Sequence, residues 1–473
     1  MKKNITKKAV ANVGYLFLGN IVAKLISFIT VLAIARKLGV ENFGNYSFII
    51  SFAFIFSVFG SFGIDSILMR EVSKAKKRAS KYLGNVLFMK LILAIITLVI
   101  SIAVIKMMNY EFYFGIYIMI FSIILDFFSN TFISLFRAFQ KMKYESLLLI
   151  FSKIVWASFI LVLLFLNYSF IILIFAFVIS STFNLILGSI LCFSKITKPK
   201  FKLDIDLWKF LIKNSWPLGL NLIFMTLFFR IDIVLLSLIK GSMAVGIYSA
   251  AHKVIDEFGF IRESLLIAVF PMFCIFVHKL KNEKEIYKRT IKHLLVIFIP
   301  IAVGGTLLAE KIILFLYKEP FIDSAIVLKI LIWAIIVQAI YISGGYLLTA
   351  LNKQKLLAIS SAFAVLINVV LNLILIPKYS YVGAAVSNVL TLIFLVILLD
   401  YFLKNYKFSL IEVSYKPAFA ATIMGFFIYQ FVKLNLFLVI ISGAVIYIVL
   451  CLLLKVFTKE ELKQLLPKKI MIL

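Results

Sequence analysis

Charged side chains inside long apolar stretches are the residues of this sequence that could do chemistry. A charge near the middle of a bilayer costs about 2.5–3.5 kcal/mol on insertion scales, so such residues usually meet a partner, a cavity or a substrate. The bases of this kind that could bind an anion are Lys24, Arg230, Lys253 and Arg262. The acids of this kind that could carry a proton or a Na+ ion are Asp65, Asp126, Asp232, Asp256 and Glu257.

The apolar stretches that must position these charges are long enough to cross a membrane. The chain of 473 residues is 63% hydrophobic, and an apolar helix needs about 20 residues to cross the hydrocarbon core. Fourteen spans are predicted near 12–35, 43–69, 83–105, 112–136, 146–166, 170–193, 210–239, 245–277, 292–317, 324–350, 356–376, 381–402, 415–432 and 436–456. The gaps are short and polar, which leaves no room for a soluble domain.

Lysine and arginine alternate from one gap to the next. Of 50 such residues, 34 lie in the even-numbered gaps and the two termini, counting bases within two residues of a span's end, and only seven lie in the odd-numbered gaps. Short loops rich in Lys/Arg stay in the cytoplasm. The sequence therefore predicts a multi-pass protein of the cytoplasmic membrane with both termini in the cytoplasm. The net charge of +29 sits in juxtamembrane loops, where it meets anionic lipid, and this distribution argues against a nucleic-acid partner.

Two interpretations of the charges at depth stay open. Lys253, Asp256 and Glu257 follow one another at helical spacing and share a face, either as a salt-bridge cluster that holds helices together or as part of a cavity wall. Lys24 has no acid in its own span. It either pairs with a carboxylate such as Asp126 or lines a wet cavity.

Two further lysines are placed differently. Lys90 and Lys213 lie near the predicted cytoplasmic ends of their spans, so we expect both side chains to extend to the interface.

The two halves of the chain repeat the same turn. A G-x4-G-x-Y-S pattern begins at Gly39 and again at Gly241, an offset of 202 residues. An A-x-x-K-x-K pattern begins at Ala138 and again at Ala350, an offset of 212. Two echoes in the same order predict a duplicated six-span unit in parallel orientation. The expected parts are residues 1–199 with spans 1–6, residues 200–405 with spans 7–12, and residues 406–473 with two further spans.

Several segments resemble the polysaccharide-biosynthesis flippases of the Wzx type. The segments are Ala35 to Phe48, Phe62 to Asp65 with Arg70 and Glu71, Pro217 to Gly219, Arg230 to Asp232, and Gly246 to Lys253. The resemblance covers essentially the whole chain. It implies the fold of the superfamily shared with MATE antiporters and lipid II flippases, which is all-α with two six-helix lobes around a central cavity.

The resemblance also implies a function. A lipid-linked oligosaccharide would cross the membrane by alternating access, with the cavity bases holding its phosphate and its lipid tail in the bilayer. We expect no enzyme activity and no cofactor, and proton or Na+ coupling stays open. Polysaccharide-assembly enzymes are a further candidate partner. The alternatives are a MATE-like cation-coupled drug antiporter, which needs an anionic cavity, a membrane-embedded polysaccharide-synthesis enzyme, which needs a catalytic loop, and a scaffold, which needs no charges at depth.

Overall fold

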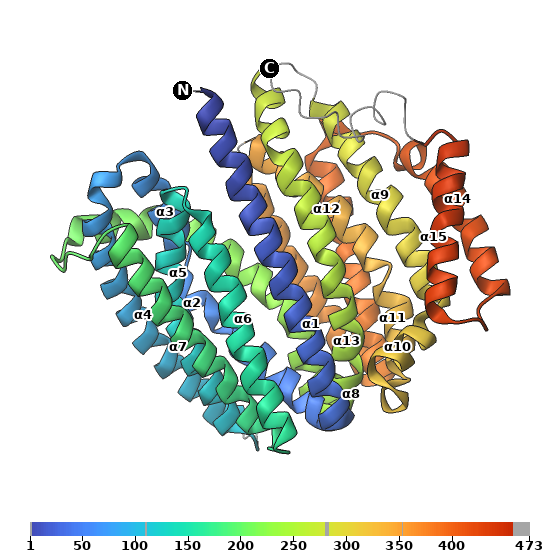
Figure 1. Ribbon diagram of the computed structural model, residues 1–473, viewed down its shortest axis with the longest axis horizontal. Helices are drawn as coiled ribbons and strands as arrows, with labels where there is room; N and C mark the ends of the chain where they lie inside the picture. The colour runs from blue at the N-terminus through green and yellow to red at the C-terminus, as the bar shows by residue number, and fades with distance from the viewer. Residues whose placement is uncertain (1, 109–110, 280–282, 352, 457–473) are drawn as a thin grey trace. The chain divides into compact units, whose positions relative to one another are not determined.

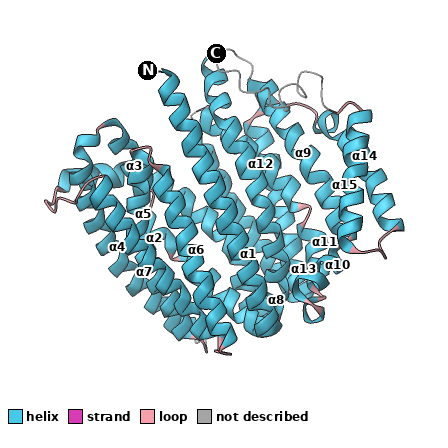
Figure 2. Ribbon diagram, viewed as in Figure 1, coloured by secondary structure: helices cyan, strands magenta, loops and turns pink. Residues whose placement is uncertain are grey.

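The computed structural model describes residues 2–108, 111–279, 283–351 and 353–456. Within these ranges the chain is helical, with short turns and no strand (Figure 2). Long apolar helices satisfy their own backbone hydrogen bonds, which a chain in lipid requires. The predicted all-α class is confirmed.

The helices follow one another with few connecting residues (Figure 1). The first half contains α1 (Lys2–Ile55), α2 (Ser57–Ser61), α3 (Ile64–Lys74), η1 (Lys76–Arg78), α4 (Ala79–Met108), α5 (Tyr113–Ala138), α6 (Met142–Phe165) and α7 (Phe170–Lys195). The second half contains α8 (Ile205–Lys279), α9 (Glu283–Leu307), α10 (Ala309–Tyr317), η2 (Glu319–Phe321), α11 (Ser324–Leu331), α12 (Ala334–Ala350), α13 (Gln354–Phe402), η3 (Lys404–Tyr406), α14 (Leu410–Gln430) and α15 (Leu436–Leu453).

Three of these helices are too long to be single spans. α8 has 75 residues and would be about 110 Å long if straight, several times the membrane thickness. Non-helical residues interrupt α1 at Gly39, α8 at Gly241 and α13 at Ser380. The chain reverses at Gly241, because the Tyr248 hydroxyl reaches the Asp232 carboxylate at 3.0 Å although 16 residues separate them.

The number of spans is confirmed only in part. In the described residues, ten helices are long and apolar enough to cross a membrane, and the three interrupted helices are among them. α14 is not among the ten. The chain is a multi-pass membrane protein, and the total of fourteen spans stays a prediction.

The two repeated turns have the same backbone conformation and touch each other. Gly39 has φ 72° and ψ 179°, and Gly241 has φ 80° and ψ −177°, values that only glycine adopts without strain. A Cβ on Gly44 would lie 1.8 Å from the Ser242 carbonyl oxygen, and one on Gly246 would lie 2.0 Å from the Val40 carbonyl oxygen. Gly44 and Gly246, like Val40 and Ser242, are 202 residues apart. The contacts are therefore reciprocal, as a duplicated turn around a two-fold axis requires.

The predicted second span is broken, which the sequence did not indicate. α2 ends at Ser61 and α3 begins at Ile64, with Phe62 and Gly63 both in the left-handed region at φ 37° and 77°. The break packs closely on α8, because a Cβ on Gly63 would lie 2.6 Å from the Ser215 carbonyl oxygen. The break puts a helix N-terminus, with Asp65 in its first turn, inside the predicted span.

Two compact units are present, Met1–Ala250 with Leu357–Ala384, and Ala251–Leu356 with Ala385–Leu473. In the first unit, α1 packs on α6 and α5 packs on α7 and α3. In the second unit, α9 packs on α12 and α14. Each unit combines segments that are separate in the sequence, so the units do not test the predicted boundaries near residues 199 and 405, which stay predictions.

Candidate functional site

Lys24 lies half-buried on α1, on a face that differs from the one packed on α6. That packed face is fixed by Gly19, whose Cβ would lie 2.2 Å from Ser146 Oγ, and by a 2.7 Å hydrogen bond from Ser146 Oγ to the Tyr15 carbonyl oxygen. Lys24 is five residues past Gly19, which turns it about 140° around the helix. Lys24 therefore lies on a different face of α1 from Gly19.

Two other bases of the first unit stack on aromatic rings. The guanidinium of Arg230, on α8, lies 5.0 Å from the centre of the Phe54 ring on α1. The ammonium of Lys153, on α6, lies 5.1 Å from the centre of the buried Trp156 ring. Cations over ring faces gain electrostatic stabilisation without a carboxylate partner on that side.

Asp126, on α5, belongs to a polar cluster among α5, α6 and α7. It accepts a hydrogen bond from Ser181 and interacts electrostatically with Lys153. Ser122 Oγ and Ser181 Oγ are 2.9 Å apart. Asp126 thus interacts with Lys153 of α6, and its pairing with Lys24 stays a prediction.

Asp65 forms a buried ion pair with Lys90. Lys90 Nζ donates to Asp65 Oδ1 at 2.7 Å, to Asp65 Oδ2 at 2.9 Å and to the Phe127 carbonyl oxygen at 2.5 Å. The Lys90 side chain is 0% exposed, so the expectation that it extends to the interface is wrong. The break before Ile64 brings Asp65 within reach of α4, and three acceptors saturate the ammonium. This pair joins α3, α4 and α5 and is a structural staple.

Asp232 is the most deeply buried of the predicted acids and lies in an oxygen-rich centre. It is 2% exposed, and it accepts from Asn372 Nδ2 at 2.7 Å and from the Tyr248 hydroxyl at 3.0 Å. Asn372 Nδ2 also donates to Asn368 Oδ1 at 2.9 Å. Asn372 Oδ1 has no hydrogen-bond partner among the described residues. The centre thus gathers a carboxylate and amide oxygens, which are hard ligands suited to a proton or a small hard cation.

Sequence reasoning missed Asn368 and Asn372. Both lie in the predicted span 356–376, four residues apart, so they share one helix face. Both side chains are 0% exposed. Uncharged amides at helical spacing inside an apolar span are a usable signal, because an amide in hydrocarbon is costly unless it is hydrogen-bonded.

The predicted charges of the second unit pair along α8 and across to α12. Lys253 Nζ lies 3.2 Å from Glu257 Oε1, and His252 Nδ1 lies 3.4 Å from Asp256 Oδ2. Arg262 is 8% exposed and donates from Nη1 to Gln338 Oε1 at 2.5 Å. Lys253 and Glu257 thus pair within one helix, and Asp256 pairs with a histidine of the same helix, so these two pairs join no second helix and both interpretations stay predictions.

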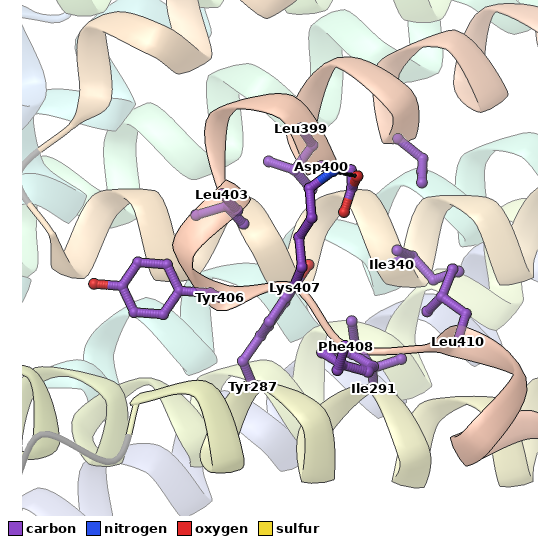
Figure 3. A pocket seen from close by; sticks show the side chains of 11 residues that line it. Tyr287, Ile291, Ile340, Leu399, Asp400, Leu403, Tyr406, Lys407, Phe408 and Leu410 are labelled. Carbon is purple, nitrogen blue, oxygen red and sulfur yellow. Dashed lines mark ion pairs between the residues drawn. The ribbon is translucent and has the colours of Figure 1, made fainter.

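A small pocket of about 70 Å³ lies in the second unit, between α9, the end of α13 and the segment that leads to α14 (Figure 3). Its walls are mainly apolar, with Tyr287 against Phe408 in an edge-to-face contact of 5.5 Å. Lys407 and Asp400 form an ion pair of 2.5 Å beside it. None of the predicted site residues lines this pocket, so it is separate from the charges described above.

The fold and its buried charges are those of a polytopic membrane transport protein. The chain belongs to the family described as Polysaccharide biosynthesis protein, which matches residues 9–277, more than half of the sequence. The MatE family also matches, over residues 217–374.

Curated relatives match parts of the chain. The probable low-salt glycan biosynthesis flippase Agl15 of Haloferax volcanii is 24% identical over 50% of this chain, and the match covers 52% of that protein. The putative O-antigen transporter of Shigella flexneri is 28% identical over 33% of this chain and 37% of its own length. The matched regions thus cover about half or less of the length of these relatives.

Solved structures share the fold over most of the chain. The lipid II flippase MurJ in an inward closed conformation has a TM-score of 0.81 at 18% identity, covering 93% of this chain and 98% of that chain. An inward-facing multidrug resistance MATE family transporter of the MOP superfamily has a TM-score of 0.68 at 14% identity, covering 81% of this chain and 95% of that chain. The predicted MATE- and MurJ-like fold is confirmed.

Proposed function

We propose that the protein flips a polyprenyl-(pyro)phosphate-linked oligosaccharide across the cytoplasmic membrane by alternating access. Family membership supports this proposal, as do the names of relatives that act on glycans. The observation that carries it is the presence of three bases within the first unit: the half-buried Lys24, and Arg230 and Lys153, whose cations stack on aromatic rings.

An anionic headgroup fits these bases better than a cationic drug does. A lysine ammonium or an arginine guanidinium can bind phosphate oxygens. Multidrug cations would instead require a net negative cavity. Lys24 and Arg230 are the proposed phosphate ligands of the first unit, and Lys253 and Arg262 are the proposed contributors of the second.

The centre at Asp232 is the proposed site of ion coupling. Protonation or Na+ binding there would neutralise a carboxylate that is otherwise costly to bury. Among the other predicted acids, Asp65 is held by Lys90 and is less suited to this role. Asp126, Asp256 and Glu257 stay secondary candidates.

Binding to the purified full-length protein tests the cationic site. A short-chain polyprenyl pyrophosphate should raise its melting temperature, and ethidium should not. Lys24→Ala and Arg230→Ala should each weaken the effective affinity about tenfold or more at unchanged folded yield, and Lys24→Arg should retain part of it. Lys213→Ala is the matched control, because Lys213 is an exposed lysine on the same helix as Arg230. Unchanged binding by Lys24→Ala and Lys24→Glu would refute the cationic site, and stabilisation by ethidium instead would favour the antiporter.

The same measurement tests coupling. Na+ should raise the melting temperature of the wild type in the millimolar range and have no effect on Asp232→Asn. A response to pH without a response to Na+ would assign the centre to protons. A variant Asp232→Asn that transports normally would remove this centre from the mechanism.

A further inference from the structure

The segment between α7 and α8 is an extended strap (residues 196–204) that is bound along the start of α4. Ser80 Oγ donates to the Lys198 carbonyl oxygen at 2.6 Å, and the Lys200 amide donates to the Ser80 carbonyl oxygen at 3.0 Å. Asn85 Nδ2 donates to the Lys202 carbonyl oxygen at 3.0 Å, and the Asp204 amide donates to Asn85 Oδ1 at 3.0 Å. Alternate residues of the strap thus bind α4 through their backbone.

The approach of the strap to α4 is very close. A Cβ on Gly84 would lie 2.1 Å from the Lys200 carbonyl oxygen, so only glycine fits at that position. The Lys81 ammonium forms an ion pair with the Asp204 carboxylate at the far end of the strap. The backbone of the strap is therefore fixed, and its side chains are presented on a rigid support.

Apolar side chains project from this support. Phe201 is 73% exposed and Leu203 is 59% exposed, and Ile205, the first residue of α8, is 68% exposed. They occupy every second position, as expected for an extended chain whose side chains alternate between two sides. A fixed row of exposed apolar side chains indicates an interaction surface.

The strap lies at the end of an exposed apolar face of α4. Gly84, Phe88, Leu91 and Ile95 follow at three- and four-residue spacing, so they lie on one face of α4. The last three are exposed apolar residues within a helix of membrane-crossing length. The strap therefore covers the end of a lipid-facing surface. Trp208 packs on Phe88 with ring centres 5.9 Å apart and donates to Asn85 Oδ1 at 2.9 Å, an arrangement typical of a tryptophan at a membrane interface.

The charge of the strap favours an anionic partner. Lys198, Lys200 and Lys202 are exposed and alternate with the apolar residues, and Lys76, Lys77 and Arg78 immediately precede α4. By the lysine and arginine pattern this end of α4 faces the cytoplasm. Each base close to an anionic leaflet adds about 1 kcal/mol of attraction.

We propose that the strap is a membrane anchor that lies in the headgroup layer of the cytoplasmic leaflet. Phe201, Leu203 and Ile205 insert at the boundary of the acyl chains, and Lys198, Lys200 and Lys202 bind the phosphates of anionic phospholipids. The anchor holds the connection between the two halves of the chain at a fixed depth. It does not depend on the identity of the transported molecule.

Nitroxide accessibility in proteoliposomes tests this proposal. The label is placed at Leu203→Cys in the full-length protein with its three native cysteines replaced. In vesicles with 30% phosphatidylglycerol, the label should be at least fivefold less accessible to a water-soluble nickel chelate than a label at Lys77→Cys, and more accessible to oxygen. Lys77 is the matched control, because it is exposed and precedes Asn85 by eight residues on the cytoplasmic side. A label at Ile95→Cys marks full immersion in lipid.

Charge removal tests the choice of lipid. The triple substitution Lys198→Gln, Lys200→Gln, Lys202→Gln leaves the backbone contacts in place, so the melting temperature should not change. It should abolish the difference in depth between vesicles with and without phosphatidylglycerol. Equal nickel accessibility of the labels at Leu203 and Lys77 in the vesicles would overturn the anchor. If the Leu203 label were protected in native membranes but not in the vesicles, the partner would be a protein and the anchor would also be overturned. Unchanged lipid dependence in the triple variant would overturn the role of the lysines.

Discussion

The two glycine turns that begin the halves of this protein are alike, but the helices that follow them are not. Gly39 and Gly241 share one backbone conformation, and Gly44 and Gly246 approach each other's turn equally closely. Beyond the first turn the chain breaks at Phe62 and Gly63, whereas α8 continues as helix to Lys279. The reciprocal contact at the two glycine turns is thus alike in both halves, whereas the path of the span that follows each turn differs.

The charges diverge as well. At the offset of 202 residues, Lys24 corresponds to Thr226, and Asp232 corresponds to Thr30. Tyr248 donates to Asp232, whereas the hydroxyl of its equivalent, Tyr46, is buried without a hydrogen-bond partner among the described residues. Packing at the turns therefore constrains both halves, and each half carries its own set of ionisable groups.

Breaking the ion pair specific to the first half should have the largest effect. Lys90→Met leaves the Asp65 carboxylate without its partner inside the membrane, and removing one member of a buried pair costs about 3–5 kcal/mol. We expect a large loss of folded protein in detergent, measured by size-exclusion chromatography and thermal unfolding. Asp65→Asn combined with Lys90→Met should recover much of that loss. No recovery in the double variant would show that Lys90 acts through packing rather than through its charge.

The ion pair also shows where sequence reasoning stops. The composition and the lysine pattern predicted the helical membrane fold, and the repeated glycines predicted a duplication whose turns do match. Depth along a span can be read from residue number, but the direction of a side chain depends on neighbouring helices. Lys90 was therefore expected to reach the interface, since neither the break at Gly63 nor the nearby Phe127 carbonyl is visible in the sequence.

The centre at Asp232 was also predictable only in part from the sequence. Asp232 stood out because it is an acid in an apolar span, whereas Asn372, its closest partner, comes from a span 140 residues away. Uncharged polar residues carry a weaker signal than charges, and their role becomes clear only when a buried carboxylate lies beside them. Contacts between distant spans are set by packing, which spacing within a span does not reveal.

Adding a methyl group at the shared turn tests whether the two halves are equivalent. Gly44→Ala and Gly246→Ala should each destabilise the protein by about 1–3 kcal/mol, because the backbone facing each glycine must shift. Equal effects are expected from reciprocal contacts. Gly14→Ala is the control, since a Cβ there meets nothing within 4 Å, and it should be neutral or slightly stabilising. Thermal unfolding of the three variants measures the differences, and a strong effect at only one turn would contradict the two-fold arrangement.

Removing a hydroxyl from each of the paired tyrosines sharpens the comparison. Tyr248→Phe takes a hydrogen bond from the buried Asp232, and a loss of about 1–3 kcal/mol is expected because the bond is to a charged group. Tyr46→Phe removes a hydroxyl that has no partner among the described residues, so stability should stay the same or rise slightly. Thermal unfolding at several Na+ concentrations separates the two, since only Tyr248→Phe should also alter the response to Na+. Equal losses in the two variants would mean that the halves use this tyrosine in the same way.

The smallest effect is expected at the strap that joins the halves, and it depends on pH. The Lys81 ammonium and, next, the Leu207 amide lower the pKa of the Asp204 carboxyl below its usual 3.8. A carboxyl whose pKa is lower in the folded state stabilises the fold above its unfolded pKa, and this contribution is lost as pH falls through the folded pKa. The contact should thus be complete above about pH 5 and weaken only below pH 3.8. Because Asp204 and Lys81 are both partly exposed at the surface, the change should be small.

A nitroxide at Phe201→Cys can measure this loosening. Its mobility should rise as the pH is lowered below 3.8 in the wild-type background. In Asp204→Asn the mobility should already be raised at neutral pH and should respond less to acid, because the neutral amide cannot form the ion pair with Lys81. Lys81→Met should behave in the same way. An equal acid response in all three backgrounds would assign the loosening to other carboxyls, and the strap would then be held to α4 by its backbone hydrogen bonds to Ser80 and Asn85 without help from the ion pair.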